Sequence, residues 1–242
     1  MLIFSIRRAA ISLKLESFKL ESLKLKPLSL RFFASCSAIP VFIYLSVVIH
    51  EYGHVLGAKL VSNQTLTVYI WPGYELHPNI GSPYKKNWPK GVVAFGGIQA
   101  PPAISSKASE IPGWKKYIDL KQEEYKPITE FDSSIIALSG SGLNSLLSVI
   151  SLLFIYIFKP KGIGLAVSVA GALLHYDLLL YSVLPIFFDL PHLIFWGGTS
   201  PEPIIALSKL GLPQYFSVSS VIFISAIQLG CLYKLLKSLP GN

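Results

Sequence analysis

Charged residues are scarce in this chain of 242 residues, because Asp, Glu, Lys and Arg together make up only 14% of it. An average soluble domain carries about 25%. Asp, Glu, Lys, Arg and His are all absent from three long stretches: residues 32–49, 133–158 and 210–233. A fourth stretch, residues 162–188, contains only His175 and Asp177 among these types. This composition excludes a disordered chain, a basic nucleic-acid-binding domain and an ordinary cytosolic enzyme.

Cysteine is scarce as well. The two cysteines, Cys36 and Cys231, both lie in apolar stretches. Two such residues do not form a disulfide framework, and their positions do not match a metal-binding pair. We interpret both as small packing residues.

Each of the four apolar stretches is long enough to cross a membrane, since a transmembrane helix needs about 20 mostly apolar residues. The chain is therefore predicted to be an all-α polytopic protein of the cell membrane, with the lipid bilayer as its environment. The net charge of +8 comes from basic residues that cluster at the edges of the apolar stretches, as expected at a lipid surface. No nucleic acid partner is predicted. The four predicted spans cover about residues 33–61, 134–158, 162–187 and 213–236.

The only sizeable polar region, residues 62–132, lies between the first two predicted spans. Within it, residues 65–71 and 92–95 are rich in β-forming side chains and end at turn signals, which predicts a small hairpin or sheet. Residues 101–132 are expected to lie in water as a loop or short helix. Residues 1–32 are predicted to be a basic N-terminal tail, and residues 33–242 a single domain. Lysines and arginines are nearly balanced on the two sides of the membrane, so the orientation stays open.

The motif His50-Glu51-Tyr52-Gly53-His54 at the end of the first apolar stretch has the pattern H-E-x-x-H. On a helix, residues four apart share one face, so both imidazoles can reach one metal ion with Glu51 beside it. Ionisable groups at the end of an apolar span are costly in lipid and therefore indicate function. We predict one Zn²⁺ ion per chain, bound by His50 and His54, with Glu51 as the general base.

A catalytic zinc site uses three protein ligands and leaves one position open. Every glutamate after the motif falls in a polar segment, whereas Asp189 and His192 follow the third span, which runs parallel to the first. His175 and Asp177 lie about three turns earlier on that helix, which is too deep to share the level of the histidines easily. We predict Asp189 as the third ligand, with His192 as the alternative. A helix-capping role is the other interpretation of Asp189.

Three segments, in this order along the chain, resemble the motifs of the site-2-protease family of intramembrane zinc metallopeptidases. Residues 48–59, Val-Ile-His-Glu-Tyr-Gly-His-Val-Leu-Gly-Ala-Lys, resemble the first motif helix of that family. Residues 139–144, Ser-Gly-Ser-Gly-Leu-Asn, resemble its middle element, in which the asparagine faces the active site. Residues 184–192, Leu-Pro-Ile-Phe-Phe-Asp-Leu-Pro-His, resemble its second motif, whose aspartate is the third zinc ligand.

The resemblance implies hydrolysis of peptide bonds in membrane-embedded or membrane-adjacent protein substrates, with Glu51 as a catalytic residue. It also implies a β-structured segment between the first two spans. For Asn144 two roles stay open, since its amide could stabilise an oxyanion or bond to a neighbouring helix. The chain departs from the family after Asp189, where Leu190-Pro191 replaces Gly-Gly.

Two rival classes of function remain. The altered second motif favours a proteolytically inactive relative that binds membrane helices. A metal or ion transporter is the other alternative, although four spans without a detectable internal repeat are unlike most transporters.

Overall fold

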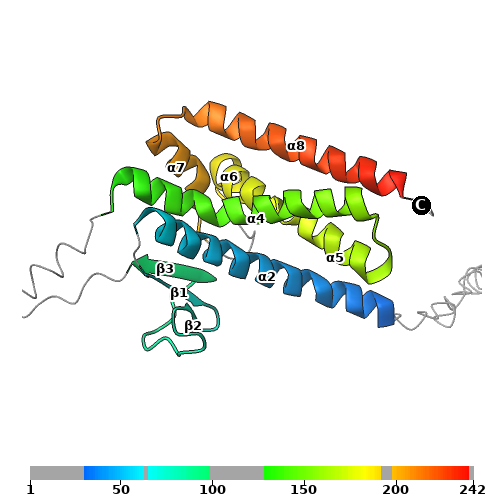
Figure 1. Ribbon diagram of the computed structural model, residues 1–242. Helices are drawn as coiled ribbons and strands as arrows, with labels where there is room; N and C mark the ends of the chain where they lie inside the picture. The colour runs from blue at the N-terminus through cyan, green and yellow to red at the C-terminus, as the bar shows by residue number, and fades with distance from the viewer. Residues whose placement is uncertain (1–29, 63–64, 99–127, 192–197, 240–242) are drawn as a thin grey trace, which may run out of the picture. The chain divides into compact units, whose positions relative to one another are not determined.

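The computed structural model describes residues 30–62, 65–98, 128–191 and 198–239. The chain divides into two compact units, Met1–Val41 and Phe42–Asn242. In the first unit the described residues, 30–41, are helical. The second unit contains the rest of that helix and all the other described elements (Figure 1). Most of the predicted tail 1–32 and of the predicted loop 101–132 lies outside the described residues.

The described chain is mostly helical, with one small sheet. Its elements are α2 (Leu30–Val61), β1 (Leu66–Ile70), β2 (Tyr74–His77), β3 (Ala94–Ile98), α4 (Glu130–Phe158), α5 (Gly162–Leu173), α6 (Tyr176–Phe188), α7 (Glu202–Lys209) and α8 (Gln214–Ser238). Among the described residues, four segments are long and apolar enough to cross a membrane: Ser37–Val61, Glu130–Phe158, Gly162–Phe188 and Gln214–Ser238. The predicted fold class, a helical membrane protein with four spans and a β insertion, is confirmed.

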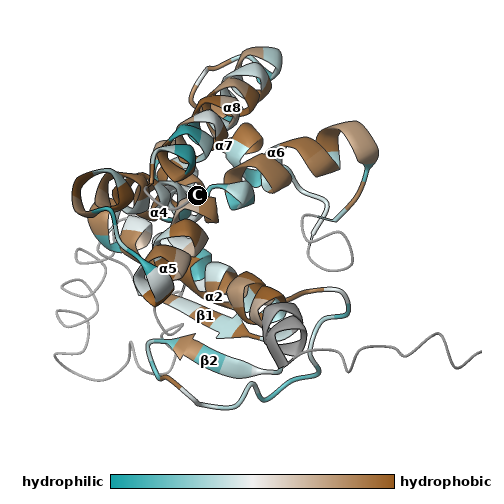
Figure 2. Cartoon of the chain, turned by 90° about the vertical axis from the view of Figure 1, so that its right-hand side faces the viewer, coloured by the Kyte–Doolittle hydropathy of each residue, from teal (hydrophilic) through white to brown (hydrophobic). Residues whose placement is uncertain are grey.

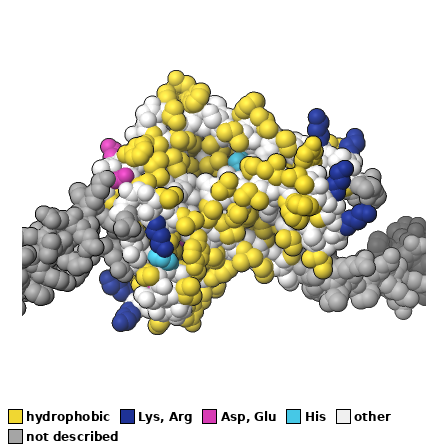
Figure 3. All heavy atoms as spheres, viewed as in Figure 1, with side chains coloured by type: hydrophobic (Ala, Val, Ile, Leu, Met, Phe, Trp, Pro, Cys, Tyr) yellow, Lys and Arg dark blue, Asp and Glu magenta, His cyan; other side chains and the backbone are white. Residues whose placement is uncertain are grey.

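The helices expose large hydrophobic side chains, as a protein in lipid does. Phe158 of α4 is 64% exposed, and Phe223 of α8 is 66% exposed. Hydrophobic side chains spread over the helices in Figure 3, whereas basic side chains gather toward the two sides of the view. Figure 2 shows the same contrast, since the helices are largely hydrophobic and the loops beside β2 are more hydrophilic.

α4 begins and ends at sequence signals that fit its position. At its start, the hydroxyl of Thr129 accepts a hydrogen bond from the Asp132 N–H, and the Asp132 carboxylate accepts one from the Thr129 N–H. This reciprocal capping box satisfies two helix-end donors. At the other end Lys159 adopts a left-handed conformation, with φ of 47°, and Pro160 follows it. The short turn leads directly into α5.

α2 and α4 approach each other closely at small residues. A Cβ atom on Gly53 would overlap the carbonyl oxygen of Ser139, and one on Gly57 would overlap the Ser139 side chain. Small residues four apart allow two membrane helices to come into direct backbone contact. Because Gly53 lies between His50 and His54, this contact brings the motif of α2 directly against α4.

The third span is one apolar segment but two helices, α5 and α6. At the end of α5 the carbonyl of Ala172 accepts a hydrogen bond from the hydroxyl of Ser148 on α4. Between the helices, His175 Nε2 forms a hydrogen bond of 2.9 Å with the hydroxyl of Ser225 on α8. Side chains from neighbouring helices thus satisfy polar groups at an interruption inside the membrane.

The sheet follows the order β2-β1-β3, with β1 antiparallel to both neighbours. It lies beside the C-terminal part of α2 (Figure 1). One buried hydrophobic cluster joins the sheet to α2 and α4: Val55, Ala58, Leu66, Val68 and Ile136. The predicted sheet is confirmed, and it contains one strand, β2, that the sequence pattern did not predict.

α7 is a short helix, and the packing of its apolar side fixes its position. Ile204 is 2% exposed and forms a buried cluster with Val218 and Val221 of α8. Leu178 of α6 packs against the same cluster. The start of α7 is therefore placed by contacts with two other helices.

Candidate metal centre

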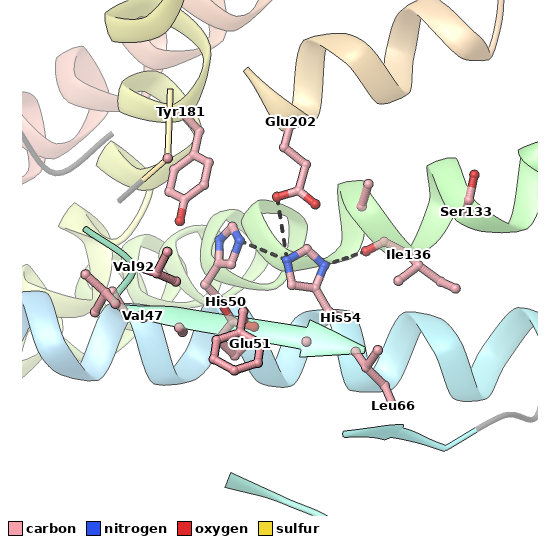
Figure 4. Close-up of a pocket in the computed structure, with 16 residues that line it drawn as sticks. Val47, His50, Glu51, His54, Leu66, Val92, Ser133, Ile136, Tyr181 and Glu202 are labelled. Carbon is pink, nitrogen blue, oxygen red and sulfur yellow. Dashed lines mark hydrogen bonds and ion pairs between the residues drawn. The ribbon is translucent and has the colours of Figure 1, made fainter. Parts of the chain in front are cut away.

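The three motif residues of α2 lie together at one cavity. His50 is 2% exposed and Glu51 is 7% exposed. Both residues and His54 line a cavity of about 310 Å³, together with Tyr181 of α6 and Glu202 of α7. Figure 4 shows the two imidazoles side by side, with Tyr181 and Glu202 on the opposite wall.

The Nδ1 atom of each imidazole is held by an oxygen that accepts a hydrogen bond. His50 Nδ1 lies 2.8 Å from the Asp177 carboxylate, and His54 Nδ1 lies 2.7 Å from the Ile136 carbonyl. A carbonyl or an ionised carboxylate only accepts hydrogen bonds, so the proton of each neutral imidazole is on Nδ1. Each Nε2 then carries a free lone pair, the state in which histidine binds metal ions.

The two Nε2 atoms face each other at 3.0 Å. Two Nε2 lone pairs that converge at this distance suit a shared cation, either a proton or a metal ion. Two nitrogens bound at 2.0–2.1 Å to one tetrahedral zinc ion lie about 3.3 Å apart, which is close to the observed distance.

The backbone of α4 approaches both imidazoles closely because residue 140 is glycine. A Cβ atom on Gly140 would lie 2.6 Å from His54 Nε2 and 2.7 Å from His50 Nε2. A bare backbone at this position therefore keeps the two Nε2 atoms free of overlap with a side chain from α4.

Carboxylates gather around the imidazoles without a basic partner. Asp177 contacts His50, and the Glu202 carboxylate lies 3.9 Å from His54 Nε2. Glu51 lines the same cavity as Glu202. Within the part of the chain that the structure describes, no lysine or arginine forms an ion pair with any of the three. A bound divalent cation would offset this negative charge.

In the part of the chain that the structure describes, one set of three side chains could hold a metal ion. One ligand atom each of His50, His54 and Glu202 lies within 4.8 Å of the other two. Two imidazoles and a carboxylate with a remaining open side match the donor set of catalytic zinc. The residues present therefore fit a zinc ion.

The structure brings together only part of the predicted site. His50, Glu51 and His54 lie together as expected. Asp189 is exposed at the left-handed end of α6, with φ of 51°, and does not belong to the group of three. The alternative ligand His192 lies outside the described residues.

Asn144 is fully buried, and its side-chain amide donates a hydrogen bond of 3.1 Å to the Ser46 carbonyl on α2. It is not among the residues that line the cavity. The sequence leaves two roles open for Asn144. This contact corresponds to one of them, a hydrogen bond to a neighbouring helix, while stabilisation of an oxyanion stays a prediction.

Residues 38–239 match the model of Peptidase family M50, the site-2-protease family. The chain belongs to this family. It has no match among curated proteins or among solved structures. Members of family M50 are in general intramembrane metallopeptidases that depend on zinc, and the paired histidines of this chain are consistent with that chemistry.

The sequence pattern does not predict two carboxylates that lie near the imidazoles, Asp177 and Glu202. Counted along one straight helix, Asp177 lies too deep in the third span, whereas in the structure α6 starts anew after the interruption. Glu202 falls in a polar segment, which does not indicate a position at the cavity. The run from Ser200 to Pro203, Ser-Pro-Glu-Pro, does carry a signal, since proline is favoured in the first turn of a helix. The apolar residues that follow it, from Ile204 onward, indicate a helix that returns to the protein interior.

Replacing Asp177 with asparagine is expected to weaken zinc binding by about 10–100-fold, the usual cost of losing an outer partner of a metal-bound histidine. The neutral amide holds the His50 Nδ1 proton more weakly than a carboxylate does, and its NH2 group can turn toward the ring and favour the other tautomer. Zinc affinity in detergent, measured by competition with a chelator, tests this. The melting temperature of the metal-free protein separates the effect from a loss of folding, and an unchanged affinity would contradict the role of Asp177.

Proposed function

We propose that this protein is a zinc-dependent endopeptidase of the cell membrane that hydrolyses peptide bonds of membrane-embedded or membrane-adjacent proteins. The observation that supports this most strongly is the convergence of the His50 and His54 Nε2 lone pairs beside Glu51 in one cavity. Family membership supports the same class of reaction.

Each residue of the motif has a distinct task in this proposal. His50 and His54 hold the metal ion through Nε2, and their Nδ1 contacts keep both rings neutral and oriented. Bound zinc would polarise the scissile carbonyl and make a nearby water more nucleophilic. The Glu51 carboxylate accepts the proton of the attacking water and then delivers it to the leaving amine nitrogen. No covalent intermediate between enzyme and substrate is required.

Strand β3 is a candidate docking site for the substrate. Ala94, Phe95 and Gly96 line the same cavity as the histidines, and β3 is an edge strand of the described sheet. Trp71 N–H donates to the Val93 carbonyl directly opposite it. Alternation along an antiparallel pair then directs the N–H groups of Ala94 and Gly96 away from β1. An extended peptide could pair with these free groups as an additional strand.

Replacing Ala94 with proline is expected to lower cleavage of substrates by about tenfold or more, because it removes one outward N–H donor from the edge. The variant Ala94→Val, which keeps the donor and favours a strand, should cleave much closer to the wild-type rate. The measurement is the initial rate of cleavage of one substrate by the wild type and by the two variants. Equal rates for Ala94→Pro and wild type would contradict strand pairing.

The proposed function is tested by incubating detergent-purified protein with a panel of single-span membrane proteins and identifying new peptide ends by mass spectrometry. Cleavage that is lost on zinc chelation and restored by added zinc supports an active peptidase. Bound zinc without any cleavage would favour the inactive helix-binding relative. Several weakly bound zinc ions per chain would favour a transport path.

A further inference from the structure

We propose that Glu202 of α7 is the third protein ligand of the metal held by His50 and His54, in place of Asp189. This inference rests on the proposed function, since it requires that the two histidines bind a metal ion. The Glu202 Oε2 atom lies 3.9 Å from His54 Nε2. Figure 4 shows the Glu202 side chain directed from α7 toward the two imidazoles.

The position of Glu202 is fixed by a packed helix and not by its own side-chain contacts. The two residues that follow it, Pro203 and Ile204, are both almost fully buried. The Ile204 and Ile205 N–H groups both donate to the Pro201 carbonyl at 3.0 Å, which closes the first turn of α7. The Glu202 side chain therefore projects from the first residue of a rigid helix, as is favourable for a side chain that binds a metal ion.

The Glu202 carboxylate has no competing cation among the described residues. Its one ion pair there is with His54. Its side chain is 38% exposed, so the carboxylate is also in contact with solvent. A catalytic zinc site likewise combines three protein donors with a position that is open to water.

Asp189 and Asp177 are less suited to this role. Asp189 is exposed and ends α6, and it does not belong to the group of three. Asp177 contacts the outer nitrogen of His50, Nδ1, at 2.8 Å, so it lies on the side of the ring away from the paired Nε2 atoms. Of these three carboxylates, Glu202 is the one grouped with both imidazoles. The metal is thus bound from α2 and α7, and α6 contributes the outer carboxylate.

The decisive experiment compares zinc binding by Glu202→Gln and Asp189→Asn. Detergent-purified protein is stripped with a chelator and titrated with zinc alone, in competition with a zinc-binding dye. We expect Glu202→Gln to bind zinc at least about 100-fold more weakly, beyond the range typical of outer partners. Asp189→Asn should bind zinc as tightly as the wild type.

Two further variants separate ligation from helix effects. Glu130 is the first residue of α4, as Glu202 is of α7, so Glu130→Gln removes a comparable charge from a helix start and should leave zinc affinity unchanged. Glu202→Asp keeps the charge but draws the carboxylate back by one methylene, and it should also weaken binding. Melting of the metal-free proteins should be similar for all variants.

The outcomes distinguish this inference from the proposed function. Zinc binding by the wild type that survives in Glu202→Gln and is lost in Asp189→Asn would overturn the role of Glu202 and leave the peptidase proposal intact. Equal weakening by Glu130→Gln and Glu202→Gln would also overturn it, since the effect would then be one of helix charge. Absence of zinc binding by the wild type would overturn both proposals.

Discussion

Substitution of Glu51 by glutamine is expected to slow peptide hydrolysis by about 10²–10⁴-fold, the usual contribution of a general acid–base group. Glutamine has nearly the shape of glutamate but cannot accept the proton of the attacking water. Glu51 lines the cavity beside His50 and His54, whose nitrogen atoms the substitution leaves in place. Zinc should therefore still bind with a stoichiometry of about one.

The measurement is a pair of assays on the same preparation of Glu51→Gln, initial cleavage rate and zinc content. A lost rate with retained zinc assigns a chemical role to the carboxylate. Loss of both would indicate that Glu51 holds the metal site together. A variant that keeps more than about a tenth of the wild-type rate would exclude Glu51 as the general base.

Substitution of Gly140 by alanine is expected to abolish zinc binding and, with it, activity. The added Cβ would lie 2.6 Å from His54 Nε2 and 2.7 Å from His50 Nε2, whereas atoms in favourable contact are about 3.5 Å apart or more. The rings would have to move by about 1 Å, and metal–ligand distances tolerate only about 0.2 Å. A displacement of this size can cost a factor of about 10² in rate.

Gly142 supplies the matched control for Gly140. It lies two residues further along α4, is exposed, and a Cβ atom there would have no neighbour within 4 Å. Gly142→Ala should therefore bind zinc and cleave as the wild type does, with equal or slightly higher thermal stability. Zinc content of the two variants tests the prediction. Equal zinc content would contradict the view that bare backbone at position 140 keeps the two Nε2 atoms free for the metal.

The spans and the metal motif were predictable because both are local properties of the chain. Apolar length alone identifies a membrane span, and the four predicted spans agree with the helices within a few residues. The i, i+4 spacing of His50 and His54 places them on one helix face wherever the helix lies. The β-forming run before Pro72 and the turn that follows it likewise predicted the small sheet.

The other parts of the site depend on how separate helices meet. Asp177 contacts His50 because the third span is interrupted and α6 starts again beside α2. Counting residues along one straight helix does not predict this position. Asn144 bonds to Ser46 because α2 and α4 come into contact at Gly53, and hydropathy does not report helix contacts.

The sequence by itself determined that this is a four-span membrane protein with two histidines and a glutamate placed for metal chemistry. Only the tertiary structure decided which carboxylate faces those histidines. Glu202 is more than 140 residues away in the chain and lies in a polar segment, so no local pattern links it to the motif. Burial of Ile204 against α8 returns the start of α7 to the cavity, and that contact is a property of the folded chain.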